Sequence, residues 1–167
     1  WENFGVGQRF ALVDFHYHPR ASYWFDHHPT TFLEPAYEAA YQESDTHKFD
    51  PEAPSCPPII MSHAIARWGF QPPAHFAELV KWSNIVDAAR FGTAEQAMFG
   101  REPAIKISRA LSCAPDYAWH DRLVQLMRSR TLMQVASDSE VERCWERSSR
   151  NRDHAIEAFP AHVLERT

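Results

Sequence analysis

The stretch "RFALVDFHYHPRASYWFDHHPT", residues 9–30, decides the fold class of this chain. Residues 9–17 form an apolar run rich in β-forming side chains, which is typical of a strand buried on both faces. Residues 22–28 repeat the pattern and end in Asp26, His27 and His28. Polar residues therefore follow each predicted strand, where open α/β sheets place their ligand crevice. We predict an α/β fold with a small parallel sheet flanked by helices.

The remainder of the chain is predominantly helical in character. Residues 45–58 are rich in Pro and Asp and predict an ordered loop, and Ser55 near its end is expected to cap the following helix. Gly69 lies near the predicted end of that helix. A longer helix is predicted over residues 73–91. Further apolar stripes predict a helix-rich C-terminal half.

Length and composition narrow the class of protein. The chain has 167 residues and 44% hydrophobic content, which predicts one domain over residues 1–167 with a real core. Its net charge of −5 argues against duplex nucleic acid as a partner. No apolar run approaches the ~20 residues of a membrane helix. The three cysteines form no CxxC pair, so we expect a cytoplasmic protein.

The tripeptide Asp26-His27-His28 is the sharpest chemical signal. Imidazole nitrogens and carboxylate oxygens together suit divalent ions such as Mn²⁺, Zn²⁺ or Fe²⁺. Adjacent residues at a strand end can divide the work, because one histidine can bind the ion while its neighbour points toward substrate. The sequence therefore predicts a metal site beside the sheet.

The order of motifs strengthens this prediction. A buried strand ends at Asp14, an aromatic strand ends in "WFDHHPT", and an "SC" loop and a helical "WSNIVDAARF" follow. Over residues 10–91 this arrangement resembles the DHH phosphoesterase superfamily. That superfamily includes RecJ-type exonucleases, nano-RNA and cyclic-dinucleotide phosphodiesterases, and a class of manganese pyrophosphatases.

The resemblance implies a set of roles for residues of this chain. Asp14 would bridge two metal ions, and His27 and Asp87 would be further ligands. His28 would face the scissile phosphate, and Asp26 would orient a histidine by a hydrogen bond. The implied cofactor is Mn²⁺ in a two-metal site, with Mg²⁺ or Zn²⁺ as alternatives.

The resemblance also implies a reaction and its partners. A metal-bound hydroxide would hydrolyse a phosphodiester or phosphomonoester. The substrate would be a small phosphorylated molecule or a short oligonucleotide, and a homodimer is compatible with the sequence. Family members carry additional aspartates before the position of Asp14, where this chain offers only Glu2, so we expect the catalytic core to be N-terminally incomplete. The glycine-rich C-terminal substrate domain of the family is not found in this sequence.

Two alternative functions follow from the same residues. A degenerate, non-catalytic DHH-like module would bind or regulate without hydrolysis. The pair His16 and His18 also resembles the HxH opening of metal-dependent amidohydrolases, although we expect both rings to bond to loop backbone instead. This alternative assumes that the two histidines share one face of a strand.

Several other polar residues have simpler explanations. A surface ion pair between Asp87 and Arg90 at i,i+3 would explain Asp87 without a metal. The series Arg143, Arg147 and Arg150 alternates with glutamates, which favours an ordinary charged helix surface.

Overall fold

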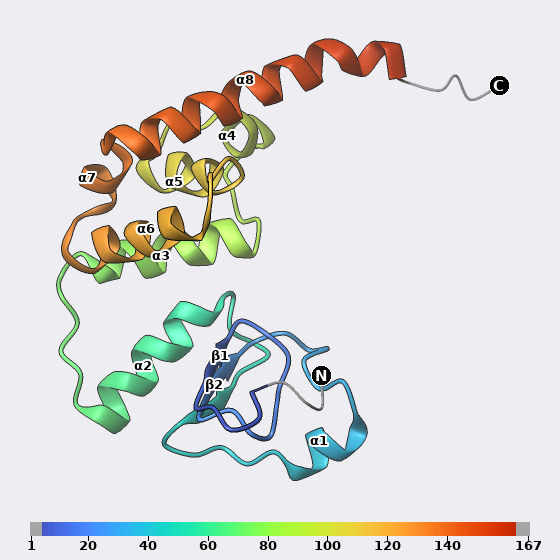
Figure 1. Ribbon diagram of the computed structural model, residues 1–167, viewed down its shortest axis with the longest axis vertical. Helices are drawn as coiled ribbons and strands as arrows, with labels where there is room; N and C mark the ends of the chain where they lie inside the picture. The colour runs from blue at the N-terminus through green and yellow to red at the C-terminus, as the bar shows by residue number, and fades with distance from the viewer. Residues whose placement is uncertain (1–4, 163–167) are drawn as a thin grey trace. The chain divides into compact units, whose positions relative to one another are not determined.

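The computed structural model describes residues 5–162 of the chain (Figure 1). Three strands, β1 (Ala11–Val13), β2 (Tyr23–Asp26) and β3 (His47–Phe49), form a parallel sheet in the order β1-β2-β3. Helices make up most of the rest, especially in the C-terminal half. The predicted fold class, a small parallel sheet with helices and a helix-rich C-terminal half, is confirmed.

The strands are shorter than the sequence pattern indicates. β1 ends at Val13 because Asp14 adopts a left-handed φ of 58°, which no strand can continue. The ladder closes where the Asp14 amide donates to the carbonyl of Phe25, with an N–O distance of 2.9 Å. Strand β3 lies inside the segment predicted to be a loop. Its three residues are too few to show a period, and it forms by pairing with β2.

Strand β2 carries the core of the N-terminal part. Alternation places Trp24 and Phe25 on opposite faces of the sheet, and their exposed fractions are only 0% and 2%. Trp24 packs among aromatic rings that include Tyr17 and Phe49, whereas Phe25 packs against Cys56 and other residues of the next helix. Replacement of Trp24 by Ala would lower the free energy of unfolding by about 3–5 kcal/mol, as is typical when a buried aromatic side chain is truncated.

Three helices accompany the sheet in this part of the chain. They are α1 (Pro35–Ala40), α2 (Cys56–Trp68) and α3 (Phe76–Asp87). Helix α2 packs on β2 and β3 and lies alongside the sheet (Figure 1). It ends at Gly69, whose left-handed φ of 63° is the predicted helix stop. Asp87 is the last residue of α3.

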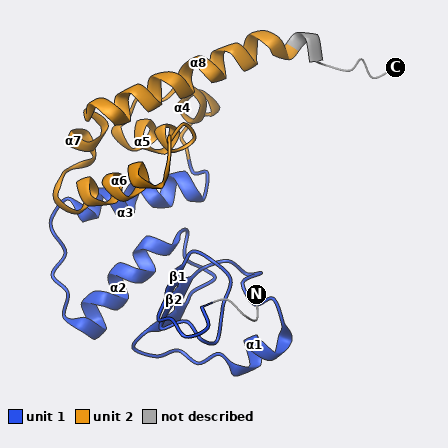
Figure 2. Ribbon diagram, in the orientation of Figure 1, with its two compact units in different colours: residues 1–90 blue, residues 91–167 orange. Residues whose placement is uncertain are grey.

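The chain divides into two compact units, unit 1 (residues 1–90) and unit 2 (residues 91–167), drawn in different colours in Figure 2. Unit 2 contains α4 (Ala94–Phe99), α5 (Pro103–Leu111), α6 (Tyr117–Ser129), α7 (Leu132–Ala136) and α8 (Ser139–His162). Within it, α5 buries an apolar face against α7 and α8. None of the helices within residues 5–162 has the length and apolar composition needed to cross a membrane. Every predicted site residue belongs to unit 1.

Candidate metal centre

Three separate elements of unit 1 bring the predicted ligands together. Asp14 follows β1, His27 follows β2, and Asp87 ends α3. Because β1 and β2 are parallel neighbours, their carboxyl ends lie at one edge of the sheet. The three side chains that the DHH resemblance selects as ligands therefore meet at this edge.

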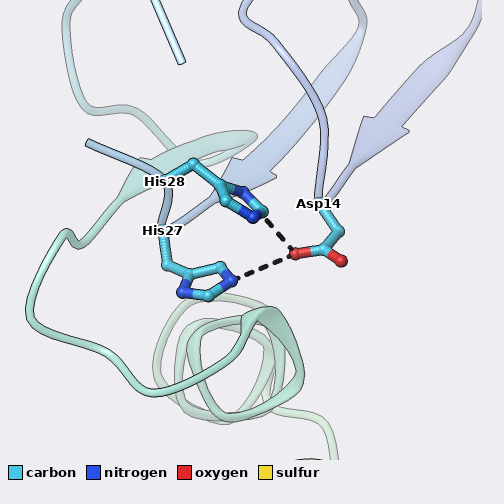
Figure 3. A group of neighbouring side chains, drawn as sticks. All are labelled: Asp14, His27 and His28. Atoms are coloured by element: carbon cyan, nitrogen blue, oxygen red, sulfur yellow. Dashed lines mark ion pairs between the residues drawn. The ribbon is translucent and has the colours of Figure 1, made fainter. Parts of the chain in front are cut away.

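His27 lies at the centre of the group. Its Nε2 atom is 3.3 Å from Oδ1 of Asp14 and 3.1 Å from Oδ2 of Asp87. Figure 3 shows the His27 ring pointing toward the Asp14 carboxylate. On its other side, Nδ1 lies 3.1 Å from the carbonyl oxygen of Ala53. A carbonyl can only accept, so Nδ1 carries the proton and, in the neutral ring, Nε2 presents a lone pair to the two carboxylates.

This arrangement calls for a positive charge. The Nε2 atom of His27 is buried and makes no hydrogen bond, although two carboxylate oxygens lie within 3.3 Å. A buried nitrogen lone pair facing two carboxylate oxygens is unfavourable unless a proton or a metal ion lies between them. A set of one imidazole nitrogen and two carboxylate oxygens suits Mn²⁺ or Zn²⁺. The residues present therefore fit a divalent cation.

His28 is the other histidine of the cluster, but its contacts differ. Among the described residues, Asp14, His27 and His28 have ligand atoms that all lie within 4.8 Å of one another. However, the nearest atom of His28 to Asp14 is Nδ1, at 4.0 Å, and this same Nδ1 lies 2.8 Å from Oδ1 of Asp26. A nitrogen that donates its proton to Asp26 cannot also bind a metal. Asp87 contacts His27 but is not part of this group, so Asp14 and His27 are the two residues shared by the group and by the ligand set that the resemblance implies.

Asp26 and His28 form a coupled pair beside the ligands. Asp26 is fully buried, and its second carboxylate oxygen, Oδ2, has no hydrogen-bond partner. The hydrogen bond from the His28 ring to Asp26 raises the pKa of His28, burial opposes this, and the charges of Asp26, Asp14 and Asp87 add to it. His28 is about half exposed, so its ring remains accessible to a ligand from solvent.

Asp14 occupies an uncommon backbone conformation. Its φ of 58° lies in the left-handed region, where aspartate is among the better tolerated residues other than glycine. Such a conformation costs of the order of 1 kcal/mol and persists only where surrounding contacts enforce it. Here the turn away from β1 brings the Asp14 carboxylate to His27.

A small open pocket adjoins the cluster. It has a volume of about 240 Å³ and is lined by Asp14, Phe15, His16, Asp26, His28 and Thr30. His28 and one proposed ligand, Asp14, thus face the same space. The pocket opens beside the part of the cluster that carries His28.

The structure separates His16 from His18, contrary to the prediction that they share a strand face. β1 ends before either residue, so strand alternation does not apply to them. His16 lines the pocket, whereas His18 is 2% exposed and packs edge-on against Phe10. Its Nδ1 accepts a hydrogen bond from the amide of Arg20, as expected for a structural histidine. A site using both rings is not formed.

Ser55 is also placed differently from its prediction. It occupies the N-cap position of α2, but its side chain makes no capping bond. The positions it would cap are Pro57 and Pro58, which have no amide hydrogen. The Ser55 hydroxyl instead donates to Oδ1 of Asn84, at 2.6 Å. The two prolines could have revealed this from the sequence alone.

The alternative explanation of Asp87 is not observed. Among the ion pairs of residues 5–162, Asp87 pairs with His27 and not with Arg90. The arginines of α8 behave as predicted for a charged surface: Arg143 lies 3.6 Å from Glu140, and Arg150 lies 3.9 Å from Glu146.

Unit 2 contains a larger hollow, of about 700 Å³, lined by residues of α6 and α8 and the loop before α6. Its size alone does not indicate a site. Its arginines are already engaged: Arg122 with Asp138 and Glu140, and Arg147 with the carbonyl of Cys113. Among the described residues, the group that could hold a metal lies beside the smaller pocket in unit 1 instead.

Compared with protein-family models, with curated proteins and with solved structures, the chain shows no significant match.

Proposed function

We propose that this chain is a metal-dependent phosphoesterase of the DHH type, in which Asp14, His27 and Asp87 hold a divalent cation. It would hydrolyse a phosphodiester or phosphomonoester in a small phosphorylated substrate or a short oligonucleotide. The observation that carries the proposal is the buried Nε2 atom of His27, which lacks a hydrogen bond and lies within 3.3 Å of two carboxylate oxygens.

The donor set favours Mn²⁺, with Mg²⁺ or Zn²⁺ as alternatives. When bound, such an ion supplies Lewis acidity that activates water and neutralises charge on a phosphoryl group. The surrounding backbone orients the side chains that would bind the ion. The Ala53 carbonyl fixes the tautomer of His27, and the left-handed backbone at Asp14 aims its carboxylate.

In this proposal His28 is the side chain that contacts the scissile phosphate of the substrate. Asp26 accepts a hydrogen bond from Nδ1, which raises the pKa of His28 and favours the imidazolium form. A protonated ring also carries a hydrogen on Nε2, which can be donated to a phosphoryl oxygen or to the leaving group. Since His28 lines the pocket, a phosphate entering there would meet this donor.

The character of the pocket and the chain favours a small substrate. A volume of about 240 Å³ accommodates a phosphoryl group and a modest substituent, and the net charge of −5 disfavours a long polyanion. The cysteines Cys56, Cys113 and Cys144 are all free thiols, which is consistent with the cytoplasmic location we propose.

The proposal is tested by hydrolysis assays with Mn²⁺ on bis-p-nitrophenyl phosphate, pyrophosphate and short oligonucleotides side by side. Wild type is expected to turn over at least one of these classes. His28→Ala is expected to lose turnover while keeping Mn²⁺ affinity within about 3-fold, because His28 is not assigned as a ligand. Full turnover by His28→Ala would contradict the role of this residue.

A second candidate function is a non-catalytic DHH-like module that binds a metal without hydrolysis. It is favoured by the ligand count, because within residues 5–162 the proposed ligands are the imidazole of His27 and the carboxylates of Asp14 and Asp87, enough for a single ion. Tight Mn²⁺ binding without turnover of any of the three substrates would support this module over the enzyme.

A further inference from the structure

The segment of residues 53–56, immediately before and at the start of α2, contacts His27, β2 and α3, and it is linked to Asp14 through the carbonyl of Phe25. The carbonyl of Ala53 accepts from the ring of His27. The thiol of Cys56 donates to the carbonyl of Phe25, at 3.2 Å, and the amide of Asp14 donates to that same carbonyl. Two of the three proposed ligands are thus tied to this segment through β2.

Ser55 provides the link to the third ligand. Its hydroxyl donates to Oδ1 of Asn84, at 2.6 Å, and also lies 3.3 Å from the hydroxyl oxygen of Ser83. Asn84 and Ser83 precede Asp87 by three and four residues on α3, so they lie on the same side of the helix one turn earlier. The contact with Ser55 therefore fixes the last turn of α3, which presents Asp87 to His27.

The local sequence explains why this hydroxyl is available. The side-chain oxygen of a serine at an N-cap ordinarily accepts a hydrogen bond from a backbone amide of the first turn. Here those positions are Pro57 and Pro58, which have no amide hydrogen. Ser55 is only 1% exposed, so its hydroxyl depends for hydrogen bonding on the side chains of α3, Asn84 and Ser83. Its position is thus explained by the contact with α3 and not by stabilisation of α2.

We propose that Ser55 is a positioning residue of the metal centre, which acts through Asn84 to hold Asp87 within reach of the ion bound by His27. The inference rests on the proposed function in one respect, that Asp87 is a metal ligand. Ser55 itself touches neither the ion nor the substrate.

Titration of the full chain with Mn²⁺, read as free Mn²⁺ by electron paramagnetic resonance, tests the proposal without an activity assay. Partners that hydrogen-bond directly to a ligand typically affect metal affinity about 10–100-fold, and Ser55 is one step further away, so Ser55→Ala is expected to weaken binding about 5-fold. Asn84→Ala is expected to act similarly. The matched control is Ser62→Ala on the same helix, whose exposed hydroxyl bonds only to the carbonyl of Ile59.

Double variants separate positioning from a general loss of structure. The double variant of Ser55→Ala and Asn84→Ala should bind Mn²⁺ as either single variant does, because both remove one contact. In the Asp87→Asn background, Ser55→Ala should no longer change the affinity. An equal loss in that background, or wild-type affinity in both Ser55→Ala and Asn84→Ala, would overturn the proposal. If circular dichroism shows that Ser55→Ala does not fold, Asn84→Ala replaces it in the same comparison, because Asn84 is partly exposed.

The same titration distinguishes this inference from the proposed function. If Asp87→Asn and His27→Ala bind Mn²⁺ as wild type does, the metal centre itself is wrong. If both weaken binding while Ser55→Ala and Asn84→Ala do not, the metal centre stands and only the positioning role fails.

Discussion

Replacing His27 by alanine gives the most direct test of the metal centre. In the proposed metal centre the ring would supply the nitrogen ligand between two carboxylates from different elements, so a bound ion would join the ends of β1, β2 and α3. Such an ion binds the folded state selectively and stabilises it by linkage. The predicted effect is therefore a Mn²⁺-dependent rise in melting temperature that His27→Ala reduces.

The size of the effect can be worked out. At a free Mn²⁺ concentration 100 times the wild-type Kd, binding stabilises the fold by about 2.7 kcal/mol. Loss of a direct ligand should weaken affinity at least ~10-fold, which leaves about 1.4 kcal/mol in His27→Ala at the same concentration. With about 2–4 °C per kcal/mol for a chain of this size, the shift should fall from about 5–11 °C to about 3–6 °C.

The assay is differential scanning calorimetry of each variant with and without Mn²⁺, so that only the shift is compared. His154→Ala is the matched control, because His154 is an exposed histidine of α8, in unit 2. An undiminished shift in His27→Ala would refute the ligand assignment. Equal losses in the two variants would show instead that Mn²⁺ binds to histidines without selectivity.

Three further predictions concern other residues. Asp14→Asn should weaken Mn²⁺ binding at least ~10-fold while the melting temperature without metal changes little, because asparagine also tolerates the left-handed backbone; a large loss of metal-free stability would contradict this. The Arg122 guanidinium, which contacts both oxygens of Asp138, lowers the pKa of that carboxyl. The pair should therefore stabilise the fold fully above the ordinary Asp pKa of about 3.9, and the contribution should disappear as pH falls through the lowered value. Urea unfolding should accordingly show that Asp138→Asn lowers the free energy of unfolding at pH 7, and that this loss vanishes at a pH below the lowered pKa of Asp138. A loss of stability that does not change with pH would refute the mechanism. Burial raises the pKa of Cys56 to about 12, so iodoacetamide at pH 8 should label Cys113 well before Cys56, as read by mass spectrometry of peptides.

The sequence by itself determined the fold class and the edge at which the site lies. Two apolar runs that end in polar residues predict parallel strands with their carboxyl ends together, since a buried strand must be apolar on both faces. The tripeptide Asp26-His27-His28 and the resemblance around it selected the residues that meet at that edge. Periodicity alone did not reveal β3, because three residues in a strand carry no detectable period and the pairing with β2 is long-range.

Only the tertiary structure decided which atoms do what within the cluster. Adjacent histidines look equivalent in sequence, yet His27 turns Nδ1 to the Ala53 carbonyl and Nε2 to Asp14 and Asp87, whereas His28 turns Nδ1 to Asp26. The contact of Asp87 with His27, rather than with Arg90, likewise depends on how α3 meets the sheet edge. Such assignments depend on side-chain directions and on partners distant in the chain, which local spacing does not encode.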